Sequence, residues 1–202
     1  MRATNSTSRG SQRARRRGAD LEDALLEAAW DVLVNHGYNG FTYEAVADRA
    51  GTSRPVLYRR WPRHDDLLLA TLRRHWRPVP VPDTGSMRGD ALQFLSDLSR
   101  ARTQLTTILT VQLHDYFVGT GTSLGDLRAA LRASESARPF GLIVDRAVAR
   151  GELPARDRPA RMIELPFDLL RHEMLMTLRP VPAAAIEQIV DDLWIPLLRL
   201  AR

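Results

Sequence analysis

The chain has 202 residues, 44% of them hydrophobic, so it is long and apolar enough to form one large or two small packed domains. It contains no cysteine, which excludes disulfides, thiol nucleophiles and thiolate metal sites. No apolar run approaches the roughly 20 residues that a membrane span requires, and no cleavable signal region precedes the fold. We therefore expect a cytoplasmic protein.

The formal net charge of +5 is confined to the first part of the chain. Arginines outnumber acidic residues as far as Val79, and the two balance from Pro80 onward. This distribution is expected when a nucleic-acid-binding domain is joined to a domain with another task.

Residues 1–18 are polar and rich in serine, threonine and arginine, with a cluster at Arg13, Arg15, Arg16 and Arg17. The segment has too few apolar side chains to bury, so we predict a disordered basic tail. Two roles are compatible with this composition. The tail could enter the minor groove of DNA, or it could add nonspecific attraction to the phosphate backbone, which we favour.

The first helix is predicted from Asp20 to His36. Its apolar residues recur at intervals of three and four, at Leu21, Leu25, Ala28 and Val32. Gly37 is expected to end it. This helix should brace the elements that follow, because two short helices cannot enclose a core alone.

The stretch from Phe41 to Trp61 predicts two short helices separated by a glycine turn. Apolar residues recur three and four positions apart in each half, at Val46, Ala47 and Ala50 and then at Val56, Leu57 and Trp61. Gly51 lies between them, and glycine readily adopts the left-handed conformation that ends a helix sharply. Thr42 and Ser53 are predicted to cap the two helices, and Pro55 falls in a first turn, where its missing N–H is harmless. This is the helix-turn-helix plan.

The second of these helices is strongly basic. No acidic residue lies between Gly51 and His64, so an exposed helix here would repel itself unless an anion faced it. We expect that anion to be DNA phosphate, and a solvated basic surface is the alternative. Arg54 lies where recognition helices meet base edges and can donate two hydrogen bonds to guanine, whereas Tyr58, Arg60 and His64 suit phosphate contacts. The predicted DNA-contacting residues are Thr42, Tyr43, Ser53, Arg54, Pro55, Tyr58, Arg59, Arg60, Arg63 and His64.

A fourth helix is predicted from His64 to Trp76 and should join two domains. Three prolines from Pro78 to Pro82 break the helical pattern after it, which gives predicted domains at 19–79 and 86–202. Beyond the prolines every segment again has a helical pattern, with no strand alternation. The predicted helices there are 87–102, 104–117, 124–131, 133–150, 159–178 and 183–201.

The string GTSRPVLYRRWPRHDDLLLATL, from Gly51 to Leu72, resembles the end of the DNA-binding domain of TetR-family transcriptional repressors. The resemblance extends from about Asp20 to Trp76. It implies an all-helical protein in which an N-terminal three-helix helix-turn-helix domain is joined by a linking helix to a C-terminal ligand-binding and dimerisation domain. His64 departs from the family pattern, because many members have a phosphate-contacting lysine there. We expect this contact to be weaker, or to depend on histidine protonation.

The last two predicted helices carry too many apolar residues for a single buried face. A second subunit is the expected cover, and burial in a monomeric core is the alternative. The resemblance implies a homodimer joined by two C-terminal helices of each chain, and an inverted-repeat operator with half-sites about 34 Å apart. The predicted interface residues are Met162, Phe167, Leu170, Met174, Ile186, Ile189, Val190, Leu193, Trp194 and Leu197.

The resemblance also implies that the C-terminal domain binds a small-molecule effector, which releases the protein from double-stranded DNA. Candidate pocket residues supply aromatic and apolar surface with a few polar groups: Phe94, Leu98, Leu109, Gln112, Leu113, Tyr116, Phe117, Phe140, Phe167, His172 and Met174. Most residues of these types are more often part of an ordinary core. The small number of charges among them favours a hydrophobic ligand.

No enzyme site, metal or cofactor is predicted. His172 and Glu173 begin a zinc-protease motif, but Met176 stands where the second histidine is required. The sequence thus predicts a dimeric, ligand-responsive, DNA-binding repressor. The first alternative is a ligand-independent regulator or an activator of the same fold. The second is an all-helical small-molecule-binding protein or enzyme with a vestigial helix-turn-helix.

Overall fold

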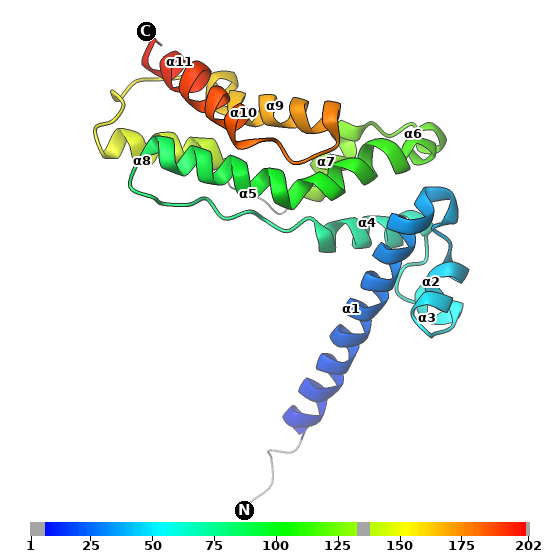
Figure 1. The fold of residues 1–202 in the computed structure, drawn as a ribbon. Helices are drawn as coiled ribbons and strands as arrows, with labels where there is room; N and C mark the ends of the chain where they lie inside the picture. Colours follow the sequence, from blue (N-terminus) through cyan, green and yellow to red (C-terminus); the bar gives the residue numbers. More distant parts are fainter. Residues whose placement is uncertain (1–6, 133–137, 201–202) are drawn as a thin grey trace, which may run out of the picture. The chain divides into compact units, whose positions relative to one another are not determined.

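The computed structural model describes residues 7–132 and 138–200, and it describes side chains for 18–131 and 138–200. Predictions made for Met1 to Ser6 and for 133–137 therefore lie outside the described residues. Within the described ranges every regular element is a helix and none is a strand, as Figure 1 shows. The all-helical prediction is confirmed. No helix in these ranges is long and apolar enough to cross a membrane.

The chain divides into two compact units. The first holds the described residues up to Arg77 together with Gln112–Leu131, and the second holds Pro78–Val111 and the described residues from Arg132 onward. The domain ranges 19–79 and 86–202 remain predictions. The sequence did not indicate that Gln112–Leu131 belongs to the first unit, because a helical pattern does not specify which neighbour a helix packs against.

The first unit is built on four consecutive helices: α1 (Thr7–Gly40), α2 (Tyr43–Arg49), α3 (Arg54–Tyr58) and α4 (His64–His75). α1 packs against both α2 and α4, and α2 packs against α3. Two later helices, α6 (His114–Thr120) and most of α7 (Leu124–Arg132), complete the unit. The predicted helix-turn-helix domain, with a brace behind it, is confirmed. Its fully buried side chains include Leu25, Leu33, Phe41, Val46, Leu57, Leu67 and Leu68.

α1 begins at Thr7, well before the predicted start at Asp20. The structure thus corrects the prediction of disorder for residues 7–18. Alanine, arginine and glutamine, which are good helix formers, dominate residues 12–17, and no proline interrupts them. The predicted break at Gly37 is confirmed, because its φ of 64° and ψ of −171° lie outside the helical region.

Polar and aromatic contacts fix α1 to α4. Arg74 donates from Nε to Glu27 at 2.9 Å and from a terminal nitrogen to Asp23 at 2.6 Å. One turn away in α1, the Trp30 ring stacks on His75, with centroids 3.8 Å apart and planes 10° apart. Because these contacts hold the C-terminal end of α4 against α1, the two helices together support α2 and α3.

The stack on Trp30 should make folding stability depend on pH. Burial lowers the pKa of His75 below its ordinary value of 6.5, helped by Arg74 and Arg77 and opposed by Glu27 and Asp31. The unfolded chain therefore takes up the proton more readily, so this histidine's contribution is complete above about pH 6.5 and is lost as the pH falls toward the lowered value.

We expect His75→Gln to flatten the decline of unfolding free energy between about pH 7 and pH 5 in urea titrations. His172→Gln, which changes an exposed histidine on the second unit, is the matched control. An unchanged pH profile in the His75 variant would contradict this account.

The second unit is organised around α5 (Met87–Thr107), which packs against α8 (Pro139–Ala149), α9 (Ala160–Thr177) and α10 (Ala183–Glu187). The chain ends in α11 (Ile195–Leu200), and Figure 1 shows α5, α8, α9 and the α10–α11 segment lying beside one another. Their core is apolar and aromatic, and includes Phe94, Leu95, Phe140, Ile143, Leu170, Val190 and Trp194.

Two segments that the sequence predicts as ordinary helix are π-helical. The first, Ile108–Gln112, directly follows α5, which runs on to Thr107 instead of breaking near Arg102 as predicted. The second, Gln188–Trp194, ends just before Pro196. A proline cannot donate to the carbonyl four residues earlier and its ring crowds that carbonyl, so a widened turn at this place relieves the conflict.

Candidate nucleic-acid interface

The turn between α2 and α3 has the geometry that the sequence predicts. Thr42 begins α2, and its hydroxyl accepts a hydrogen bond from Ala45 N at 3.1 Å. Gly51 has a φ of 64°, in the left-handed region where other residues are strained. Ser53 occupies the N-cap position of α3, but its side chain makes no capping bond, so the predicted cap is corrected there.

Gly51→Ala should strain this turn without causing a clash, since no heavy atom would lie within 4 Å of the added carbon. We expect a loss of roughly 1 kcal/mol, because an L residue pays about this much in the left-handed region. Gly119→Ala is the matched control. Gly119 lies within α6, has no positive φ and also has open space around it, so alanine should be neutral or stabilising there. Thermal unfolding of both variants measures the difference, and an equal effect would contradict the argument.

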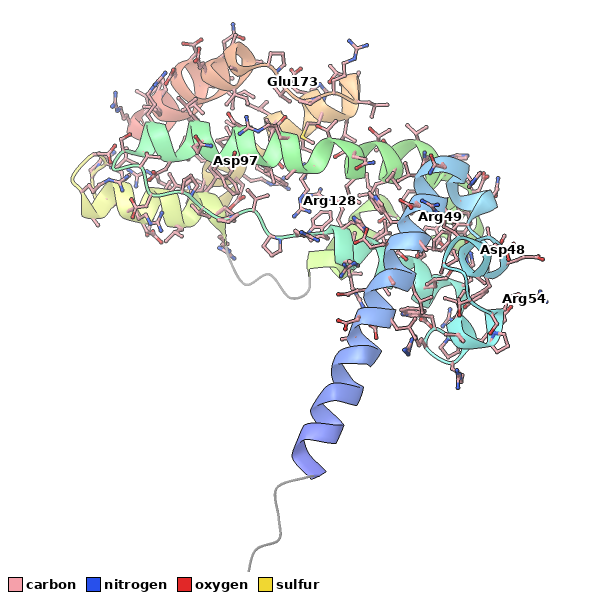
Figure 2. The ribbon with its side chains drawn as sticks, turned by 60° about the horizontal axis from the view of Figure 1, so that its bottom comes forward. Asp48, Arg49, Arg54, Asp97, Arg128 and Glu173 are labelled. Carbon is pink, nitrogen blue, oxygen red and sulfur yellow. The ribbon has the colours of Figure 1, made fainter. Side chains whose placement is uncertain are left out.

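α3 presents one face to the core and the other to solvent. Leu57 is fully buried and Val56 is half-buried, whereas Arg54, Pro55, Tyr58 and Arg59 are exposed. Neither Arg54 nor Arg59 makes an ion pair with any residue that the structure describes. Figure 2 shows Arg54 extending away from the ribbon at the edge of the unit. Two exposed guanidinium groups without a described ion-pair partner therefore lie at the start of α3 and directly after its end.

Tyr43 and Tyr58 have different environments although their rings lie only 4.2 Å apart. Tyr43 donates its hydroxyl hydrogen to the carbonyl oxygen of Trp61 at 2.6 Å, which ties α2 to the segment that follows α3. Burial raises the pKa of Tyr43, and Tyr58, Asp66 and Asp65 raise it further. Tyr58 is 47% exposed. The geometry thus makes Tyr43 a positioning residue and leaves Tyr58 available to a ligand.

His64 points into the unit. Its Nε2 donates to the carbonyl oxygen of Phe41, and its ring meets the rings of Tyr38, Phe41 and Tyr43 edge-on. The sequence predicts that this side chain contacts a phosphate. In the structure its Nε2 is already bonded to a backbone carbonyl and is not free for that contact. No sequence signal predicted this, because the partner is a backbone carbonyl 23 residues earlier.

The remaining basic residues are less free than Arg54 and Arg59. Arg60 is half-buried, and its Nε is enclosed with no hydrogen-bond partner among the described residues. Arg63 is exposed, but its guanidinium lies 3.8 Å from Asp65. Arg49, on α2, is held by Asp31 at 2.5 Å. Since Glu44 and Asp48 on α2 are exposed acids, the positive charge of this surface is concentrated on α3.

The predicted pocket residues are divided between the two units. Phe94, Leu98, Phe140 and Met174 lie in the core of the second unit, Phe167 packs at its edge, and His172 is exposed. Leu109 is buried just after α5. The other four, Gln112, Leu113, Tyr116 and Phe117, belong to the first unit, where Gln112 donates to the carbonyl oxygen of Val34 at 3.0 Å and Tyr116 meets Tyr38 edge-on. This anchoring of α6 to α1 had no signal in the sequence.

Most of the predicted interface residues are buried within their own chain. Six of them lie in the core of the second unit: Leu170, Met174, Ile186, Ile189, Val190 and Trp194. Met162, Phe167 and Leu197 are half-buried, and Leu193 is 50% exposed. An apolar pattern predicts burial, but it does not distinguish a neighbouring helix from a second subunit. Leu200 is not among the predicted interface residues, yet it is 76% exposed on α11.

Comparison with known proteins identifies the class. Residues 25–71 match the family model described as bacterial regulatory proteins of the tetR family, and residues 81–193 match the tetracyclin repressor-like C-terminal domain. The chain belongs to the TetR family. It is a DNA-binding transcriptional regulator and not an enzyme.

Individual proteins agree with this assignment. The chain is 30% identical, over 91% of its length and 96% of the other, to the DNA-binding transcriptional repressor TetR of Mycobacteroides abscessus. It is 47% identical over 51 residues, 25% of this chain and 23% of the other, to the transcriptional activator FasR of Mycolicibacterium smegmatis. A TetR regulator from Streptomyces coelicolor has the same fold, with a TM-score of 0.52 and 22% identity over 89% of this chain and 99% of that one.

Proposed function

We propose that this regulator is a homodimeric repressor that binds an inverted-repeat operator through α3 and is released by a small hydrophobic molecule. The observation that carries the DNA contact is the outer face of α3, where Arg54 and Arg59 are exposed and have no described ion-pair partner. Arginine can donate two hydrogen bonds to the O6 and N7 atoms of guanine, so Arg54 is the proposed base-reading residue.

The dimer is supported by an apolar strip at the end of the chain. Leu193, Leu197 and Leu200 recur at intervals of four and three, and each is half-buried or exposed in the single chain. Exposed apolar strips of this kind favour association with a second copy. A twofold axis through this strip would give two copies of α3, as an inverted repeat requires.

The hydrophobic character of the effector is supported by the buried polar groups of the second unit. Among its described residues, only Asp90 and Ser99 are buried polar side chains. Asp90 accepts hydrogen bonds from Thr84 N at 2.6 Å and from Arg150 at 3.3 Å, and Ser99 accepts one from Val181 N at 2.7 Å. Both are already satisfied, so an effector in this interior would be recognised by its apolar surface. It releases DNA if it prefers the conformation that does not fit the operator.

Activation is the second candidate, because the relative FasR is described as an activator. Transcription in vitro from a promoter that carries the bound repeat separates the two. We expect added protein to lower the transcript yield, with recovery when an effector is added. A higher yield would replace the repressor by an activator, and unchanged yield despite operator binding would contradict both.

A further inference from the structure

The N-terminal part of α1 is not covered by the family match. That match begins at residue 25, which is also where α1 first buries a side chain, since residues 19–24 are exposed. The helix nevertheless continues back to Thr7, so it extends about 27 Å beyond its packed part at 1.5 Å per residue. In Figure 1 this blue segment runs beyond α2 and α3 with no other described helix of the unit beside it.

The extension carries unbalanced positive charge. Residues 7–18 contain no acid and five arginines, Arg9, Arg13, Arg15, Arg16 and Arg17. The nearest acid in the sequence is Asp20, which lies within one helical turn of Arg16 and Arg17 only. Arg13 is four residues from both Arg9 and Arg17, a spacing at which like charges destabilise a helix. A helix of this composition is stabilised by an anionic partner.

We propose that residues 7–18 form a helical arm that binds the phosphate backbone of the duplex flanking the operator. This inference rests on the proposed DNA-binding function and adds a second contact surface to it. At 1.5 Å per residue this arm is about 18 Å long, roughly five base-pair steps, and duplex DNA carries one phosphate per 3.4 Å on each strand. Phosphate contacts carry no base information, so the arm adds affinity without changing the preferred sequence.

The test compares two double variants of the full chain that lose the same charge. Arg13→Gln with Arg17→Gln removes two arginines from the arm. Arg161→Gln with Arg179→Gln removes two exposed arginines of the second unit that have no ion pair with a described residue. Fluorescence anisotropy on one labelled operator duplex gives the binding constant of each protein across a series of salt concentrations.

The arm variant should show a shallower salt dependence. If all four replaced arginines of a dimer contact phosphates, the slope of log K against log salt falls in magnitude by about 3.6. The control should keep the wild-type slope. Equal slopes in the arm variant and the wild type would overturn the proposal, and so would an equal change in the control, because that would reflect overall charge alone.

Duplex length localises the contact. Extending the operator by about ten base pairs on each side should tighten binding of the wild type and leave the arm variant unchanged, whatever the flanking sequence. A gain confined to A·T-rich flanks would overturn the phosphate contact in favour of minor-groove insertion. Failure of the wild type to prefer any shared sequence would instead contradict the proposed function, so the two failures are distinguishable.

Discussion

Replacing Arg54 and Arg59 together with alanine should reduce specific operator binding by about 30-fold or more, because each bidentate arginine–guanine contact contributes roughly 1–3 kcal/mol and a dimer has two copies. Both side chains are exposed on α3 and neither has an ion-pair partner among the described residues, so the fold should be unaffected. Thermal unfolding checks that expectation, and anisotropy with operator and random duplexes measures the loss.

The matched control is Arg161→Ala with Arg179→Ala, which removes the same charge from exposed positions of the second unit. It should bind operator and random duplexes as the wild type does. The α3 variant should lose most of the difference between the two duplexes. If its preference for the operator equals that of the wild type, α3 does not read the sequence.

The second large effect is expected at the end of the chain. Leu193→Glu with Leu200→Glu places two charges on an apolar strip that is open to solvent in the single chain. We expect the dissociation constant of the dimer to rise by at least about 100-fold, because charges buried at an apolar interface without partners are costly. Analytical ultracentrifugation measures it, and operator affinity should fall in parallel because a single half-site remains.

Val118→Glu with Met176→Glu is the control for that change. These two residues are also large, apolar and exposed, but they lie on α6 and near the end of α9. The control should remain dimeric. A monomeric control, or a dimeric variant at Leu193 and Leu200, would place the interface elsewhere.

The local structure of the DNA-binding unit was predictable from residue types. Gly37 and Gly51 mark real breaks, and Thr42 caps α2, because these effects depend only on a residue and its close neighbours in sequence. His64 was different. Its side chain reaches the carbonyl of Phe41, and no pattern in the sequence describes that distance.

The interface and pocket residues remain predictions, and the reason is physical. An apolar periodicity states that a face is buried, and it does not state what buries it. Trp194 is enclosed by its own chain and donates its Nε1 hydrogen to Met162 O at 3.1 Å, whereas Leu193 beside it is half exposed. Likewise, Leu109 and Leu113 are both buried apolar residues on one continuous stretch, yet they belong to different units.

The central claim is that α3 gives this regulator one preferred DNA sequence. The measurement that tests it most directly is selection of bound fragments from the source genome by the purified protein, at a fixed salt near physiological because nonspecific attraction depends on salt. The account predicts enrichment of a single inverted repeat, with no such enrichment by the variant lacking Arg54 and Arg59. Fragments without a shared sequence would contradict it, because the arginines would then provide only nonspecific attraction.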